Sequence, residues 1–143
     1  INKLTQSGTS LDKELVFLLT THTAQLNKCS FCVDIGRALA LRGKMSVEKV
    51  NSLGNYSGCG LFSEAEIAAL RYIEETTVAK KVSDDTFAEM KKYYSDTEIA
   101  EITVVNAAET FYNMVNIPLE IESDGLCALV PGYNSKEAAP ITS

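Results

Sequence analysis

The sequence predicts an all-α fold, a single domain built from about six helices. Apolar residues recur at spacings of three, four and seven along most of the chain, which is the period of a helix with one buried face. Helix-start signals stand before several of these stretches, and no β-hairpin signal competes with them. A chain of 143 residues, 45% of them hydrophobic, is also long enough to bury one core of its own.

Each helix is expected from its own boundary signals. Ser10 precedes the first helix and Ser46 the third, because a serine side chain commonly caps the free N–H groups at a helix start. Gly43 ends the second helix. Acidic residues begin the fifth helix. A capping box, which is a serine followed three residues later by a glutamate, begins the fourth helix and the sixth. The helices are expected at 11–27, 29–43, 46–54, 63–80, 84–94 and 96–116, with capping boxes at Ser63 and Glu66 and at Ser95 and Glu98.

This helical pattern defines a domain over residues 11–122, which an irregular tail follows over residues 123–143. Turn residues gather in one long loop inside the domain, residues 54–60. The tail contains glycines and prolines that prevent a long helix. Its apolar side chains suit it to packing at an interface. These are Leu126, Leu129, Val130 and Tyr133.

Composition excludes two classes of partner. The chain has a net charge of -6 with only 13 basic residues, so it offers no basic stripe for nucleic acid. No apolar run approaches the roughly 20 residues of a membrane-spanning helix, so no membrane partner is expected. Four cysteines without a recognisable signal peptide indicate a reducing compartment, and we expect a cytoplasmic protein.

The motif Cys29-Ser-Phe-Cys32 is the strongest sign of chemistry. Two thiols three residues apart on a helix lie on the same face, so one can attack a substrate and the other can close a disulfide on it. A break near residues 27–28 would place both at the start of the second helix, where free N–H groups and the helix dipole stabilise a thiolate. This reasoning does not decide which sulfur is the nucleophile.

His22 and Glu14 are the candidate partners of the thiols. His22, the only histidine, falls on the apolar stripe of the first helix that leads towards Cys29. A neutral imidazole there would accept a thiol proton. The alternative is a core histidine that a backbone carbonyl satisfies. Glu14 opens the same helix, where it either belongs to a proton relay or only complements the helix dipole.

Metal binding is the main alternative for a CxxC motif. The further candidate ligands are His22, Cys59 and Cys127, and their separations match no compact zinc-site spacing. We therefore expect no metal and no other cofactor, and we expect Cys59 and Cys127 to be free thiols. Acidic pairs at 74–75 and 84–85 are expected to be solvated surfaces or helix starts.

Six short segments are informative in combination. They are Glu14-Leu15-Val16, Gln25-Leu26-Asn27-Lys28-Cys29-Ser30-Phe31-Cys32-Val33, Gly43-Lys44-Met45-Ser46, Phe62-Ser63-Glu64-Ala65-Glu66, Ser95-Asp96-Thr97-Glu98-Ile99 and Asn113-Met114-Val115-Asn116. In this order they resemble the carboxymuconolactone decarboxylase and alkylhydroperoxidase D-like (AhpD-like) family. The resemblance spans most of residues 11–122, so it does not rest on the cysteine motif alone.

The resemblance implies an all-helical AhpD-like fold, a homo-oligomer and thiol peroxidase activity. In the family branch with a CxxC motif, the second cysteine attacks a peroxide and the first resolves the sulfenic acid into a disulfide. Carried over to this chain, these are Cys32 and Cys29. Reduction of the disulfide would then need a reducing thiol protein or a small dithiol.

Two positions depart from the family pattern. The family motif continues with a histidine four residues beyond the second cysteine, where this chain has Gly36, and its relay glutamate falls on Phe17. The usual proton relay is therefore missing, and we expect His22 with Glu14 to substitute for it. Asp34 is a poorer candidate because it faces away from Cys32. A neighbouring subunit is another source of the missing groups.

The sequence thus predicts a thiol-dependent peroxidase with two rivals. The first is a redox-inert binding or structural protein, which the losses at Gly36 and Phe17 favour. The second is a disulfide reductase or thiol-redox sensor, which would cycle the same cysteine pair with protein thiols and react poorly with peroxide.

Overall fold

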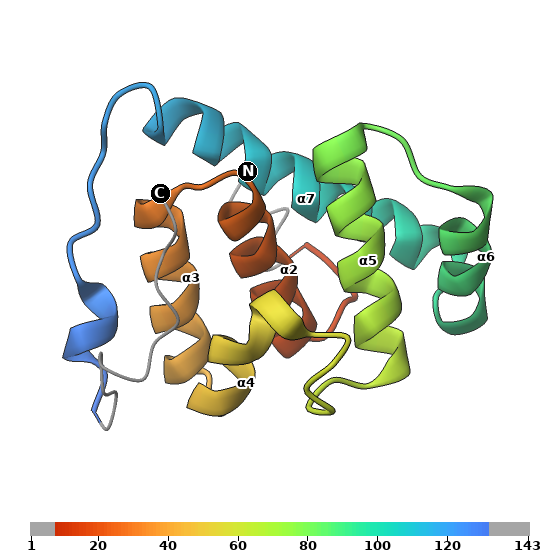
Figure 1. Cartoon of the computed structure of the whole chain (residues 1–143), viewed down its shortest axis with the longest axis horizontal. Helices are drawn as coiled ribbons and strands as arrows, with labels where there is room; N and C mark the ends of the chain where they lie inside the picture. The colour runs from red at the N-terminus through yellow and green to blue at the C-terminus, as the bar shows by residue number, and fades with distance from the viewer. Residues whose placement is uncertain (1–7, 132–143) are drawn as a thin grey trace.

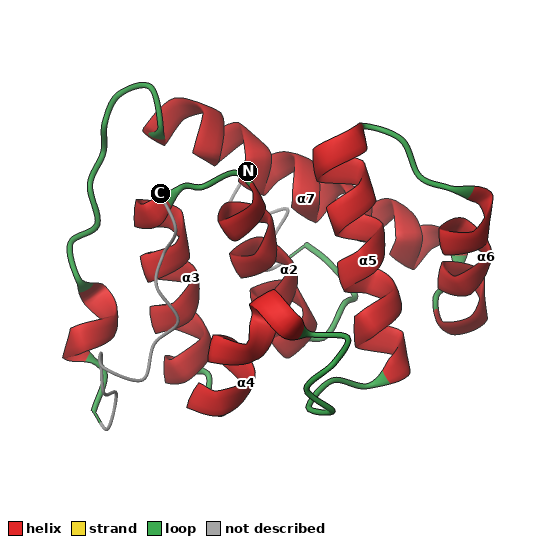
Figure 2. Cartoon of the chain, viewed as in Figure 1, coloured by secondary structure: helices red, strands yellow, loops and turns green. Residues whose placement is uncertain are grey.

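The computed structural model describes residues 8–131 and confirms the all-α fold. Within this range the chain forms six α-helices and two short 3-10 helices and no strand (Figure 2). None of the helices in this part of the chain is both long and apolar enough to cross a membrane. The elements are α2 (Lys13–Leu26), α3 (Ser30–Arg42), α4 (Val47–Asn51), η1 (Ser52–Asn55), α5 (Glu64–Ala79), α6 (Asp84–Tyr93), α7 (Asp96–Asn116) and η2 (Leu126–Leu129).

The helix starts follow the capping signals with one exception. Serine side chains cap α4, α5, α6 and α7, and both predicted capping boxes form. The prediction that Ser10 starts the first helix is wrong. Asp12 caps α2 by accepting a hydrogen bond from the Glu14 N–H at 2.8 Å. The Ser10 hydroxyl instead donates to the Glu101 carboxylate on α7 at 2.8 Å.

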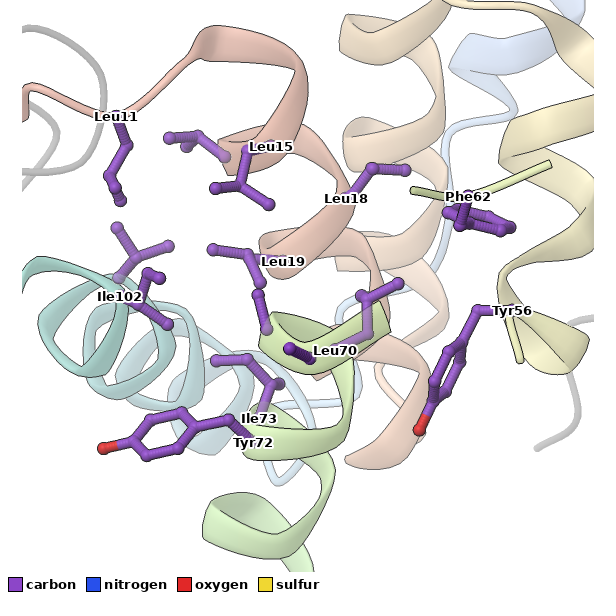
Figure 3. Packing of buried hydrophobic residues seen from close by; sticks show 14 of the residues in the cluster. Leu11, Leu15, Leu18, Leu19, Tyr56, Phe62, Leu70, Tyr72, Ile73 and Ile102 are labelled. Atoms are coloured by element: carbon purple, nitrogen blue, oxygen red, sulfur yellow. The ribbon is translucent and has the colours of Figure 1, made fainter. Parts of the chain in front are cut away.

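Helix α2 lies at the centre of the fold and packs against α3, α5 and α7. Figure 1 shows α2 between α3 and α5, with α7 crossing these helices. In Figure 3, Leu18 and Leu19 of α2 approach Leu70 and Ile73 of α5 and Ile102 of α7, and all five side chains are fully buried. Each such side chain contributes about 1.5–3 kcal/mol through removal of apolar surface from water.

A sharp reversal after α2 positions the cysteine pair. Asn27 caps the end of α2, and Lys28 adopts a left-handed backbone conformation with φ of 61°. The Cys29 N–H donates to the Ala24 carbonyl at 3.0 Å, which closes the end of α2 before α3 begins. The predicted break near residues 27–28 is confirmed, and it places both cysteines at the start of α3.

The segment after α7 returns along α3, where Asp34 holds it (Figure 1). The Asp34 carboxylate accepts hydrogen bonds from the N–H groups of Leu126 at 2.6 Å and Cys127 at 3.0 Å. The start of η2 therefore packs on its own domain, whereas the predicted interface residue Leu129 is exposed. The rest of the tail, including the predicted interface residue Tyr133, lies outside the described residues.

Candidate redox site

Cys29 and Cys32 form a disulfide at the start of α3, with their Cα atoms 5.3 Å apart. Cys29 is the N-cap residue, and its sulfur accepts a hydrogen bond from the Cys32 N–H at 3.3 Å. Cys32 lies in the first turn, where N–H groups have no partner within the helix. At this position the helix dipole favours a thiolate once the disulfide is reduced.

A cavity of about 400 Å³ lies beside Cys32, between α2, α3 and α7. Cys32 contributes to its wall and Cys29 does not, although both side chains are otherwise buried. A small molecule in the cavity would therefore meet Cys32. The rest of the wall is mostly apolar and consists of Val16, Phe17, Thr20, Phe31, Ile35, Gly36, Leu39, Glu109, Tyr112 and Asn116.

Helix α7 supplies a polar side of this cavity. Asn116 Nδ2 donates a hydrogen bond to Cys32 Sγ at 3.4 Å. Two turns earlier, the Glu109 carboxyl accepts a hydrogen bond from Asn113 Nδ2 at 2.7 Å, and Asn113 Oδ1 accepts one from Asn27 at 2.9 Å. Burial raises the pKa of Glu109 to about 7, although the bond from Asn113 acts in the opposite direction.

His22 is buried, as its place on the apolar stripe of the first helix predicts. Its ring packs edge-on against Tyr56 at a centroid distance of 5.3 Å, and it does not line the cavity. Neither ring nitrogen makes a hydrogen bond of ordinary geometry within the described part of the chain. Burial lowers the pKa of His22, while Glu74 and Gln25 act in the opposite direction. Within residues 8–131, no hydrogen bond, ion pair or ring contact joins His22 to Cys32.

Glu14 is also not brought to the cysteine pair. Its carboxylate pairs with Lys49 at 2.6 Å, and the same lysine pairs with Glu66 at 2.7 Å. Glu14 lines a separate hollow beside the start of α5, together with Ser63 and Glu66. The relay role predicted for His22 and Glu14 therefore has no support from their positions and stays a prediction.

The two residues that replace the family's relay, Phe17 and Gly36, both line the cavity. Gly36 is required because α2 and α3 approach closely there. A Cβ atom at this position would lie 2.5 Å from Thr21 Oγ1. A histidine side chain thus has no room at position 36 unless the Thr21 side chain or one of the two helices shifts.

Asp34 binds η2 and does not line the cavity. Burial opposes its ionisation, but the hydrogen bonds from Cys127 and Leu126 outweigh this effect and lower the pKa of Asp34. Its position agrees with the prediction that Asp34 is a poorer candidate for a relay group.

Cys59 and Cys127 are free thiols, as expected. Burial, together with the Asp34 carboxylate, raises the pKa of Cys127 to about 12, so this thiol is a poor nucleophile. Between residues 8 and 131, no three His, Cys, Asp or Glu side chains gather in a way that could hold a metal ion.

Sequence reasoning missed the contribution of α7. Glu109, Tyr112 and Asn116 stand at spacings of three and four, so they share one helix face. The sequence alone shows this spacing of polar residues within an amphipathic helix. It does not reveal which other helix the face meets, because that contact joins segments more than 80 positions apart.

No protein-family model matches the chain. The uncharacterized protein YnjA of Escherichia coli K12 is 25% identical over 127 residues, which cover 88% of this chain and 70% of YnjA. The likeness extends over nearly all the helices described above, so it is not limited to the cysteine motif.

Solved structures match this chain more closely in fold than in sequence. ATU0492 from Agrobacterium tumefaciens, a protein of unknown function proposed to be the antioxidant defence protein AhpD, has a TM-score of 0.81 at 24% identity, over 85% of this chain and 84% of its own. The debrominase Bmp8 has a TM-score of 0.76 at 21% identity, over 82% and 64% of the two chains. An uncharacterized peroxidase-related protein from Silicibacter sp. TM1040 has a TM-score of 0.71 at 15% identity, over 99% and 70%. These similarities show that the chain has the AhpD-like fold.

Proposed function

We propose that this protein, with its AhpD-like fold, is a thiol-dependent peroxidase that reduces peroxides through a dithiol and disulfide cycle of Cys29 and Cys32. The observation that carries the proposal is that the two cysteines differ in their access to the cavity. Cys32 lies in the first turn of α3 and opens on a cavity, whereas its disulfide partner Cys29 is buried behind it. This is the arrangement that a nucleophile and a resolving thiol require.

In the proposed cycle, the Cys32 thiolate attacks a peroxide oxygen, an S–O bond forms and the O–O bond breaks. The leaving oxygen takes up a proton and departs as an alcohol, or as water when the substrate is hydrogen peroxide. Cys29 then attacks the sulfenic acid sulfur and releases water, which forms the disulfide. An external dithiol, either a thiol protein or a small molecule, returns two electrons and two protons.

The apolar wall of the cavity favours peroxides that carry an apolar group. Phe17, Ile35 and Leu39 come from α2 and α3, so a hydrocarbon chain or ring next to Cys32 would be removed from water. We therefore expect an organic hydroperoxide to react faster than hydrogen peroxide does.

Self-association is part of the proposal, as the family resemblance implies. The end of α7 and the segment after it expose large apolar side chains, among them Phe111, Met114 and Leu119, which are 52%, 68% and 66% exposed. We propose that a second copy of the chain covers this surface. Light scattering on the purified protein tests it, and Met114→Lys is expected to shift the protein towards the monomer. We also propose a reducing compartment such as the cytoplasm, where a dithiol donor is present.

A second candidate is debromination, which the name of the debrominase Bmp8 suggests. The observation in its favour is the aromatic character of the cavity, where Phe17, Phe31 and Tyr112 lie next to Cys32 and would stack on a ring. In this reaction an aryl C–Br bond is replaced by a C–H bond, bromide leaves, and the two thiols supply the electrons as they become a disulfide.

The decisive experiment is stopped-flow reaction of the reduced protein with hydrogen peroxide, cumene hydroperoxide, a bromopyrrole and a protein disulfide, with thiols counted before and after. For a peroxidase we expect fast loss of two thiols with peroxide. Cys32→Ser should abolish the reaction, and Cys29→Ser should leave a trapped sulfenic acid. Rates no faster than a free thiol would favour the redox-inert rival. Faster reaction with a protein disulfide than with either peroxide would favour the reductase or sensor.

A further inference from the structure

We propose that Glu109 is the proton-exchanging residue of this site, receiving the proton that Cys32 releases and returning it to the departing oxygen atom. The proposal rests on the thiol chemistry proposed above. It adds a group from α7 that the family resemblance does not provide.

Glu109 and Cys32 line the same cavity. Glu109, Tyr112 and Asn116 lie on one face of α7, and Asn116 at the end of that face reaches the Cys32 sulfur at 3.4 Å. Seven residues separate Glu109 from Asn116, or about 10 Å along the helix axis. The proton is therefore exchanged through the substrate or solvent in the cavity, and not by direct contact of the two side chains.

Among residues 8–131, Glu109 is the only carboxyl group that lines the cavity, and none of these lining residues is a histidine. Phe17 and Gly36 stand where the family resemblance expects the relay glutamate and histidine, and neither can carry a proton. Both line the same space as Glu109. The cavity thus lacks the carboxyl group that the family resemblance expects from α2, and it has a carboxyl group from α7.

Two amide side chains hold Glu109 in place. Asn113, which is fully buried, accepts a hydrogen bond from Asn27 through Oδ1, so its Nδ2 is turned to donate to Glu109. Asn27 caps α2 and stands two residues before Cys29. With burial raising its pKa to about 7, Glu109 can both accept and return a proton at neutral pH, which is what a general acid and base requires.

Every proton in the proposed reaction with a peroxide is accounted for. The Cys32 thiol gives its proton to the Glu109 carboxylate, and the thiolate attacks the peroxide. As the S–O bond forms and the O–O bond breaks, the leaving alkoxide takes the proton from the Glu109 carboxylic acid. Glu109 is again a carboxylate when Cys32 has become a sulfenic acid. The proton of Cys29 later leaves with the sulfenic hydroxyl as water.

Glu109→Gln tests the proposal, because glutamine has the same shape and can still accept the hydrogen bond from Asn113. The exposed Glu122→Gln is the matched control. Both are made in the Cys29→Ser background, and iodoacetamide modification of Cys32 is followed against pH by mass spectrometry. We expect two titration steps with Glu109 present, because the thiol and the carboxyl titrate as a coupled pair, and one step in Glu109→Gln. With both cysteines present, the peroxide rate at pH 7 should fall at least about tenfold.

The two readouts separate this proposal from the proposed function. If the peroxide reaction depends on Cys32 and Glu109→Gln keeps both the rate and the two-step titration, Glu109 is not the proton exchanger and the peroxidase function stands. If Glu109→Gln loses a titration step but no variant consumes peroxide faster than a free thiol, the peroxidase function is overturned and Glu109 remains the proton acceptor of Cys32. Circular dichroism of each variant confirms that the fold is kept.

Discussion

The side-chain amide of Asn116, at the end of α7, donates a hydrogen bond to the Cys32 sulfur at 3.4 Å across 84 positions of the chain. The contact brings a donor from a second helix, α7, to the sulfur. Together with the dipole of α3, such a donor stabilises negative charge on the sulfur after reduction. The reactivity of Cys32 therefore depends on α7 as well as on the CxxC motif.

Asn116→Ala removes this donor. We expect the pKa of the Cys32 thiol to rise and the peroxide rate at pH 7 to fall about tenfold, since a hydrogen bond to a charged group contributes about 1.5 kcal/mol or more. Ultraviolet absorbance of the thiolate against pH in the Cys29→Ser background gives the titration, and stopped-flow mixing gives the rate. Asn55→Ala, at an exposed asparagine, is the control. An unchanged titration would mean that Asn116 only packs against the disulfide.

Gly36→Ala tests the close approach of α2 and α3. Alanine gains about 1 kcal/mol of helix propensity over glycine. Its Cβ would however lie 2.5 Å from Oγ1 of the buried Thr21, so the Thr21 side chain or one of the helices must shift. Overpacking of this kind costs about 1–3 kcal/mol. We expect a net loss of about 1 kcal/mol in the free energy of unfolding, measured by urea denaturation.

Thr21→Ala supplies the control for this pair, because it removes the oxygen that the new methyl group would meet. In the Thr21→Ala background, Gly36→Ala is expected to be neutral or stabilising. An equal loss in both backgrounds would show that the contact with Thr21 Oγ1 does not set the cost.

Asp34→Asn tests how η2 is held on α3. Hydrogen bonds lower the pKa of Asp34 in spite of its burial, so the folded protein keeps this carboxylate ionised to a lower pH than the unfolded chain does. Its contribution to stability is complete above the unfolded pKa of about 3.9 and is lost as the pH falls through the folded pKa. We expect Asp34→Asn to lower the free energy of unfolding by about 1.5–3 kcal/mol at neutral pH.

The difference between Asp34→Asn and the wild type should shrink as the pH is lowered, and urea denaturation at a series of pH values measures it. Asp124→Asn, at an exposed position of the same segment, should show no such difference. Cys127 in Asp34→Asn is expected to react faster with iodoacetamide, because the Asp34 carboxylate accepts a hydrogen bond from the Cys127 N–H and helps to raise the pKa of the Cys127 thiol. A difference that stays constant with pH would contradict this account.

The fold could be predicted from the sequence because its signals are local. The serine caps, the capping boxes and the break near residues 27–28 all depend on neighbours within a few positions. The exception is the start of the first helix, where Asp12 caps α2 and the Ser10 hydroxyl donates to Glu101, 91 positions away.

The candidate site could be predicted only in part for the same reason. The cysteine pair and its place at the start of α3 follow from spacing and a local turn. The environments of Glu14 and Glu109 do not, since Glu14 pairs with Lys49, 35 positions away, and Glu109 joins the cavity through packing of α7 against α2 and α3. Helical periodicity indicates that one face of a helix is buried, but it does not indicate which other helix packs on that face.

His22 is the residue for which sequence and structure suggest different roles, and its burial makes a prediction about pH. Burial lowers the pKa of His22, with Glu74 and Gln25 opposing. The unfolded chain therefore binds a proton at a higher pH than the folded protein, and stability falls as the pH drops below the unfolded value of about 6.5. We expect urea denaturation to show this loss between about pH 7 and pH 5 in the wild type and a smaller one in His22→Gln.

The same variant separates the two roles. A core histidine packed on Tyr56 affects the pH dependence of folding and leaves the titration of Cys32 in place, because its ring is turned to η1 and α5 and lies outside the cavity wall. A proton acceptor would remove a titration step of Cys32, as is expected of Glu109→Gln. Iodoacetamide modification of Cys32 in the Cys29→Ser background therefore compares both variants in one assay. Loss of the step in His22→Gln alone would assign the proton to α2, and loss in Glu109→Gln alone would assign it to α7.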